Sequence, residues 1–178
     1  TNGRTMMGIT PSDLVNLQAD LPTPLAAYGT NCGLGAAEVV TAIINMRQAA
    51  DLAGSDPILV AKGNCGIPEW VDGKICYSGT PELMASYTEM VIDAGARIVG
   101  GCCGTTPEHI AVMRKAIDNH VAGSAPSHDD ITSILGVITS GAKAQMRGDL
   151  TIAGGAAGPG KKASARGRRR QKTDSSVL

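Results

Sequence analysis

The sequence lacks any long hydrophobic run. No apolar stretch in its 178 residues approaches the roughly 20 residues that a helix needs to cross a bilayer. The first residues, TNGRTMMGITPSD, also lack the basic start, apolar middle and small-residue cleavage site of a signal peptide. Without an export signal, the five cysteines favour a reducing compartment, where thiols are more often metal ligands or reactive groups than disulfides. We therefore expect a cytoplasmic protein that does not associate with membranes.

Aromatic residues are also scarce, with no phenylalanine, one tryptophan and three tyrosines. The formal net charge is zero, but residues 161–178 hold seven basic residues and one acid, which leaves a net charge of −6 on residues 1–160. Basic arms bind phosphate backbones without sequence specificity, yet no aromatic residue is interleaved in this tail. We expect the tail to be solvated or to adjust oligomerisation, and nucleic-acid binding is disfavoured.

Three segments repeat one plan, in which a short apolar run ends in glycine and cysteine and an amphipathic helix follows. The predicted strand segments are residues 24–35, 57–68 and 96–106, and the predicted helices are residues 35–54, 80–95 and 106–120. Thr80-Pro81 and Thr106-Pro107 are typical helix starts. We interpret residues 69–79 as a loop and expect a further helix near residues 10–20.

Apolar strands that alternate with helices predict an α/β fold with a parallel sheet. Three to four βα units cannot close a (β/α)8 TIM barrel, which needs eight and about 250 residues. We therefore expect residues 1–123 to be the C-terminal half of a barrel whose first half is missing. A capped helix at 127–146, within an extension of residues 124–149, should pack on the domain or against a neighbouring subunit as a homo-oligomer contact. Residues 150–178 read as a disordered basic tail.

Cysteines stand at the ends of the first and third predicted strands. Because the carboxyl ends of parallel strands meet at one edge, Cys32 should lie near the adjacent pair Cys102 and Cys103. Three thiolates would bind Zn²⁺ and leave its fourth position open, as in catalytic zinc sites. The alternative for any one of these cysteines is a small buried hydrophobe. For the three together, the metal site is the preferred interpretation.

For the other residues near this edge, the sequence supports less specific predictions. Asn31 and Asn64 are candidates for orienting the site, although a turn role explains them about equally well, and Thr105 is a candidate for lining the pocket. Cys65 and Cys76 are interpreted as structural or incidental, and the three histidines, His109, His120 and His128, are not needed for the chemistry. Trp70 is expected to pack or to touch substrate.

The motifs GTNC at residues 29–32 and GGCCG at residues 100–104 resemble the homocysteine S-methyltransferase family. The resemblance covers roughly residues 1–120, and it implies a zinc-dependent barrel whose metal ligands map onto Cys32, Cys102 and Cys103. It further implies transfer of a methyl group to the thiol of homocysteine, forming methionine. In the family the methyl donor is held mainly by the first half of the barrel, so the fragment alone is expected to be inactive. We favour betaine or a related onium donor.

Three alternatives remain at this stage. The first is the homocysteine-binding module of a cobalamin-dependent methionine synthase. A non-enzymatic alternative is a structural zinc module that binds nucleic acid through its basic tail, and it requires four protein ligands rather than three. A redox role for Cys102 and Cys103 is the third, although the spacing lacks the C-x-x-C pattern of redox helices.

Overall fold

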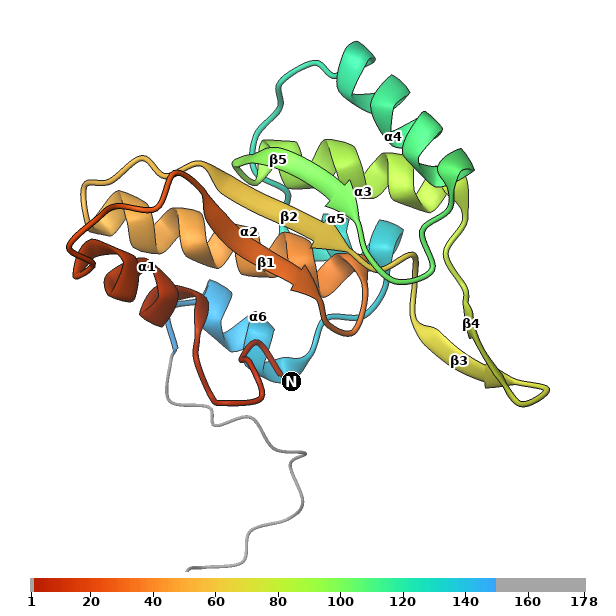
Figure 1. Ribbon diagram of the computed structural model, residues 1–178, viewed down its shortest axis with the longest axis horizontal. Helices are drawn as coiled ribbons and strands as arrows, with labels where there is room; N and C mark the ends of the chain where they lie inside the picture. The colour runs from red at the N-terminus through yellow and green to blue at the C-terminus, as the bar shows by residue number, and fades with distance from the viewer. Residues whose placement is uncertain (1, 150–178) are drawn as a thin grey trace, which may run out of the picture.

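The computed structural model describes residues 2–149, which form a small parallel sheet with helices on one face (Figure 1). The strands β1 (Tyr28–Cys32), β2 (Leu59–Gly63) and β5 (Ala96–Gly101) are parallel and adjacent in the order β1-β2-β5. Their helices are α1 (Pro11–Ala19), α2 (Ala36–Leu52), α3 (Pro81–Asp93) and α4 (Pro107–Asn119). The predicted α/β class and these three strand–helix units are confirmed. The predicted tail at residues 150–178 lies outside the described residues.

The helices begin where the sequence predicts them because side chains satisfy their first free N–H groups. Thr80 Oγ1 accepts the N–H of Leu83, and Pro81 follows at the first helical position, where a missing N–H costs nothing. Thr10 and Asp13 form a reciprocal capping box at the start of α1. These local signals fix the positions of the helices relative to the strand ends.

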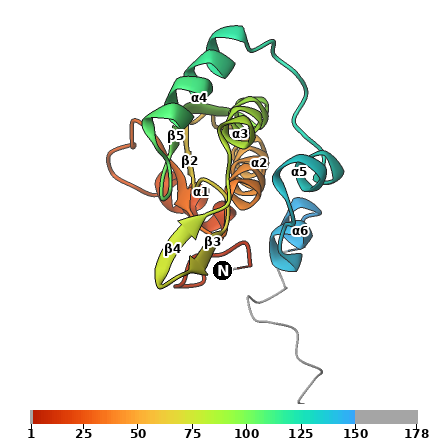
Figure 2. The ribbon, with the colours of Figure 1, turned by 90° about the vertical axis from the view of Figure 1, so that its right-hand side faces the viewer.

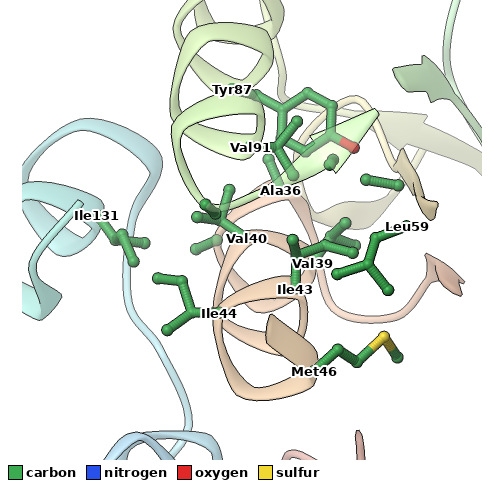
Figure 3. Close-up of a cluster of buried hydrophobic side chains, with 14 of the residues drawn as sticks. Ala36, Val39, Val40, Ile43, Ile44, Met46, Leu59, Tyr87, Val91 and Ile131 are labelled. Atoms are coloured by element: carbon green, nitrogen blue, oxygen red, sulfur yellow. The ribbon is translucent and has the colours of Figure 1, made fainter. Parts of the chain in front are cut away.

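The core lies between the sheet and helices α2 and α3 (Figures 2 and 3). The apolar side of α2 is buried: Val40 and Ile43 are fully inaccessible to solvent, and Val39, Ile44 and Met46 are nearly so. Tyr87 of α3 is also fully buried, and its hydroxyl accepts the Gly63 N–H of β2 at 2.9 Å. The packing therefore anchors the end of the central strand, from which the next residues lead into the site.

Only one face of the sheet is covered by helices among residues 2–149. Leu59 and Ala61 of β2 point toward the helices and are fully buried, whereas Lys62 lies on the opposite face and is exposed. Ile98 of β5 pairs in register with Val60 on that same open face and is 48% exposed. The described part of the chain thus leaves one face of the sheet uncovered, and this face bears Lys62 as well as Val60 and Ile98.

The prediction of a loop at residues 69–79 is wrong. Strands β3 (Pro68–Val71) and β4 (Lys74–Tyr77) form an antiparallel hairpin that projects beside the carboxyl ends of the sheet strands (Figure 1). Its turn is Asp72-Gly73, and both residues have positive φ, at 48° and 76°. Asp-Gly suits the two-residue turns that match the twist of a hairpin. Trp70 in β3 is 73% exposed, so it does not pack in the core.

The single helix predicted at residues 127–146 is also wrong, because the segment forms two helices. Helix α5 (His128–Leu135) starts at the predicted Ser127 cap, and α6 (Ser140–Met146) follows after a break. The break falls at Gly136, whose φ of 100° is incompatible with a continuous helix. Ile131 of α5 is fully buried in the core of the same chain (Figure 3). The expected homo-oligomer contact through this segment stays a prediction.

No helix within residues 2–149 is both long enough and apolar enough to span a membrane.

Because the Tyr87 phenol is buried, we expect the free energy of unfolding to decrease at alkaline pH. Burial raises the pKa of the Tyr87 phenol above its ordinary value, although the hydrogen bond from the Gly63 N–H partly offsets this effect. The folded protein keeps its proton while the unfolded chain loses it above about pH 10, so the free energy of unfolding falls as pH rises beyond that point. Tyr87→Phe should flatten this fall between about pH 9.5 and 11 in urea denaturation curves. Identical slopes for both proteins would contradict the assignment.

Candidate metal centre

Cys32 is the last residue of β1 and has an unusual backbone conformation. Its φ is 63°, in the left-handed region, which non-glycine residues seldom adopt and which is commonly found at functional sites. Asn31, the residue before it, is exposed, and its side chain is one of the groups that lower the pKa of the Cys102 thiol. The end of β1 is therefore tied by side chains to the end of β5.

Cys102 and Cys103 form the turn that follows β5, and the end of β2 holds this turn in place. The Cys102 N–H donates to the carbonyl of Gly63 at 2.8 Å, and the Cys103 carbonyl accepts the N–H of Cys65 at 2.9 Å. Both adjacent cysteines are thereby fixed by backbone bonds, independently of what their side chains bind. We refer to residues 102–104 as the ligand turn.

The three predicted cysteines converge. Cys103 Sγ lies 3.8 Å from Cys32 Sγ and 3.9 Å from Cys102 Sγ, and all three sulfurs lie within 4.8 Å of one another. Tetrahedral zinc with bonds of about 2.3 Å places its sulfur ligands about 3.8 Å apart. The observed separations therefore fit a single zinc ion with little rearrangement. None of the five cysteines forms a disulfide.

The electrostatics of the cluster also favour a cation. Burial disfavours ionisation of Cys102, but hydrogen bonds from Cys103, from Asn31 and from Cys32 outweigh it, so the pKa of Cys102 is lowered. The Tyr77 hydroxyl lowers the pKa of Cys103, but hydrogen bonds with Cys32 and Cys102, together with the charge of Cys102, raise it overall. One thiolate thus opposes ionisation of its neighbour, because like charges this close repel. A metal ion would remove that repulsion.

Cys65 and Cys76 do not join the cluster. Cys65 Sγ contacts His109 Nε2 at 3.0 Å and the carbonyl of Gly79 at 3.2 Å, and the residue is buried. Cys76 is exposed on the hairpin strand β4. Among the described residues, the group that could hold a metal therefore consists of three thiols and no fourth protein ligand.

Asn64 connects the two halves of the cluster. Its Nδ2 donates to the carbonyl of Gly33 at 3.0 Å, and its Oδ1 accepts the N–H of Cys103 at 3.2 Å. Asn64 is only 2% exposed, whereas its partners Gly33 and Cys103 lie at the surface. One buried amide thus links the residue after Cys32 to the backbone of Cys103.

Thr105 lies just beyond the ligand turn, with its side chain against Gly101 at the end of β5. Its Oγ1 is buried and has no hydrogen-bond partner in the part of the chain that the structure describes. The expectation that Thr105 lines the pocket stays a prediction.

Two contacts were missed by the sequence reasoning. His109 had been set aside, yet it is buried and contacts Cys65. Tyr77 lies in the segment interpreted as a loop, yet it pairs with Pro68 at the base of the hairpin, and its hydroxyl lowers the pKa of the Cys103 thiol. The spacing Thr106-x-x-His109 resembles a capping box and was the one available signal for His109, because histidine stands at the third helical position.

Gly104 in the ligand turn should not tolerate a side chain. Its φ is 76°, and a Cβ there would overlap Cβ and Cγ of Tyr77, atoms that cannot move without shifting the hairpin base. Gly33 has a similar φ of 84° with open space around it, so Gly33→Ala is a matched control for backbone strain alone. We expect Gly33→Ala to cost about 1–2 kcal/mol of stability, and Gly104→Ala to cost more and also to weaken zinc binding. Equal effects of both variants on melting temperature and zinc titration would contradict this.

Comparison with known protein families agrees with the residue pattern and the geometry. The family model described as homocysteine S-methyltransferase matches residues 1–117, which is about two thirds of the chain and includes all three converging cysteines. The chain belongs to the homocysteine S-methyltransferase family.

Proposed function

We propose that this chain carries the zinc site of a methyltransferase that moves a methyl group to the thiol of homocysteine and so forms methionine. The observation that carries the proposal is the convergence of three cysteine sulfurs, at separations that suit one zinc ion, without a fourth protein ligand among residues 2–149. A structural zinc module would need that fourth ligand, so the geometry favours the catalytic alternative. Membership of the family supports the choice of acceptor.

The proposed chemistry needs a thiolate, because a free thiol with a pKa near 8.5 is mostly protonated at neutral pH. Zinc held by Cys32, Cys102 and Cys103 would stabilise the deprotonated form of an incoming thiol at its open position. The homocysteine sulfur then forms a bond to the methyl carbon of the donor. The bond between that carbon and the donor heteroatom breaks, and the leaving group keeps the electron pair.

The protein's own residues supply position rather than proton transfer. Cys102 and Cys103 are fixed by backbone bonds to β2, and Asn64 sets their distance from the end of β1. A site that holds both reactants in line lowers the entropic barrier to a bimolecular transfer. Because the site consists of free thiols, we also propose a reducing, cytoplasmic location.

We propose that β1, β2 and β5 are successive strands of a (β/α)8 barrel completed by βα units outside residues 2–149. The parallel order β1-β2-β5 follows the chain, and the helices cover one face only, as in the wall of a barrel. The open face bears Val60 and Ile98, branched residues of the kind that fill barrel interiors. The donor would then be held mainly by those further units, and betaine or a related onium compound remains our proposal for it.

The donor proposal is tested by assaying methionine formation in the complete protein. Homocysteine is supplied with betaine, S-methylmethionine or methyl-cobalamin in turn, with zinc content measured in each preparation. We expect turnover with an onium donor. Turnover with methyl-cobalamin alone would instead identify the methionine synthase module, and zinc binding without any methyl transfer would overturn the enzymatic proposal.

A further inference from the structure

Cys65 contacts both ends of the segment that runs from Cys103 in the ligand turn to His109 in α4. Its backbone N–H donates to the carbonyl of Cys103 at 2.9 Å, and its Sγ lies 3.0 Å from Nε2 of His109 in α4. The chain from residue 103 to residue 109 is therefore closed into a ring by a single residue at the end of β2. Neither contact involves the side chain of a metal ligand.

The hydrogen bonds around His109 assign its protons. The Thr106 N–H lies 3.1 Å from His109 Nδ1, and because a backbone N–H only donates, Nδ1 accepts. A neutral imidazole then carries its proton on Nε2, which donates to Cys65 Sγ. The Cys65 thiol donates in turn to the carbonyl of Gly79 at 3.2 Å. Each group in this series of hydrogen bonds, from Thr106 through His109 and Cys65 to Gly79, has a partner. Cys65 is therefore held as a neutral thiol.

The network is dry, which makes it costly to break. Cys65 is 1% exposed and His109 is 8% exposed. A buried polar group that loses its partner keeps its full desolvation cost, whereas an exposed group would turn to water. The Gly79 N–H also donates to the Cys65 carbonyl at 3.1 Å, so the base of the hairpin is tied to the same residue.

We propose that Cys65 and His109 form a buried clamp whose function is to position the ligand turn for metal binding. The clamp joins the start of α4, the end of β2 and the carbonyl of Cys103, and it thereby fixes where the thiols of Cys102 and Cys103 stand relative to Cys32. His109 and Cys65 are positioning residues, since neither belongs to the three-cysteine cluster. The metal-binding part of this inference rests on the proposed function; the rigidity of the turn does not.

The variants can separate positioning from helix capping. His109→Asn places Oδ1 where Nδ1 stood, so the bond from the Thr106 N–H is kept while the contact with Cys65 is lost. Cys65→Ala removes the same contact from the other side, and Cys65→Ser retains a group that can both accept from Nε2–H and donate to Gly79. The matched control is His128→Asn, at a histidine whose side chain, within residues 2–149, bonds the exposed neighbour Asp129.

The experiment measures zinc affinity by chelator competition, and amide hydrogen exchange in the metal-free protein. We expect His109→Asn and Cys65→Ala to weaken zinc binding roughly 10- to 100-fold, as loss of outer partners does, and Cys65→Ser and His128→Asn to stay within about threefold. Exchange of the Cys65 and Cys102 amides should accelerate in the first two variants while the amides of α4 stay protected. Unchanged exchange of those amides would overturn the clamp. If exchange accelerates but the wild-type protein binds no zinc, the clamp stands and the proposed function fails.

Discussion

Replacing any one of Cys32, Cys102 and Cys103 with alanine is expected to remove zinc from the protein and to abolish methionine formation. Zinc in sulfur-rich protein sites contributes about 10–16 kcal/mol of binding free energy. Losing one of three protein ligands removes on the order of 3–5 kcal/mol of this, which weakens binding by roughly two to four orders of magnitude. The three variants should be equivalent, because the sulfurs stand in similar relation to one another.

Zinc content by atomic absorption, together with the methyl-transfer assay on the complete protein, provides the measurement. Cys76→Ala is the matched control, because Cys76 is exposed on the hairpin and outside the cluster, and this variant should retain full zinc and activity. All four side chains are at least partly exposed, so the melting temperatures of the metal-free proteins should differ little, whereas with zinc present the three ligand variants should melt at lower temperature than Cys76→Ala. Full activity in any zinc-free variant would refute the proposed mechanism.

Removing the Asn64 side chain should produce the second largest effect. Asn64→Ala leaves the N–H of Cys103 and the carbonyl of Gly33 without their present partner. Both groups belong to exposed residues, so the loss of each hydrogen bond costs about 0.5–1.5 kcal/mol, and the two halves of the cluster lose their direct link. We expect zinc affinity to fall roughly 10- to 100-fold and the protein to melt at lower temperature.

A second buried asparagine offers a control for this variant. Asn45 in α2 is 5% exposed, and its side chain makes no hydrogen bond within residues 2–149. Asn45→Ala should therefore leave zinc affinity unchanged and should not reduce stability by more than about 1 kcal/mol. If both alanine variants bind zinc as tightly as the wild type, Asn64 has no role in forming the site.

Much of the fold was predictable because its signals are local. Thr80-Pro81 and Thr106-Pro107 mark helix starts through chemistry confined to a few residues, and the apolar spacing of α2 places its buried face correctly. The convergence of the cysteines also followed from topology, because parallel strands end at one edge of a sheet. No detailed side-chain geometry was needed for that inference.

The errors arose where a local signal was present but was given too little weight. Asp72-Gly73, flanked by β-formers, is a strong hairpin signal, yet the surrounding polar residues led to the interpretation as a loop. Gly136 interrupts the apolar pattern of residues 127–146 and was passed over. Both mistakes reflect the competition between short turn signals and average polarity.

The contacts of His109 and Asn64 could not have been obtained in this way. His109 meets a cysteine 44 positions earlier, and Asn64 bonds residues 31 positions before it and 39 positions after it. Such contacts depend on how α4 and the loops pack at the edge of the sheet. Periodicity and spacing carry no information on these long-range contacts. The same contacts are what we propose to hold the thiols in place.

The most direct test of the account is the number of sulfur atoms bound to zinc, measured by zinc-edge X-ray absorption on the complete protein. We predict three sulfurs at about 2.3 Å in the absence of substrate and four after addition of homocysteine. Four protein sulfurs before homocysteine is added, or a sulfur count that homocysteine does not change, would contradict a three-cysteine site that accepts the substrate thiol.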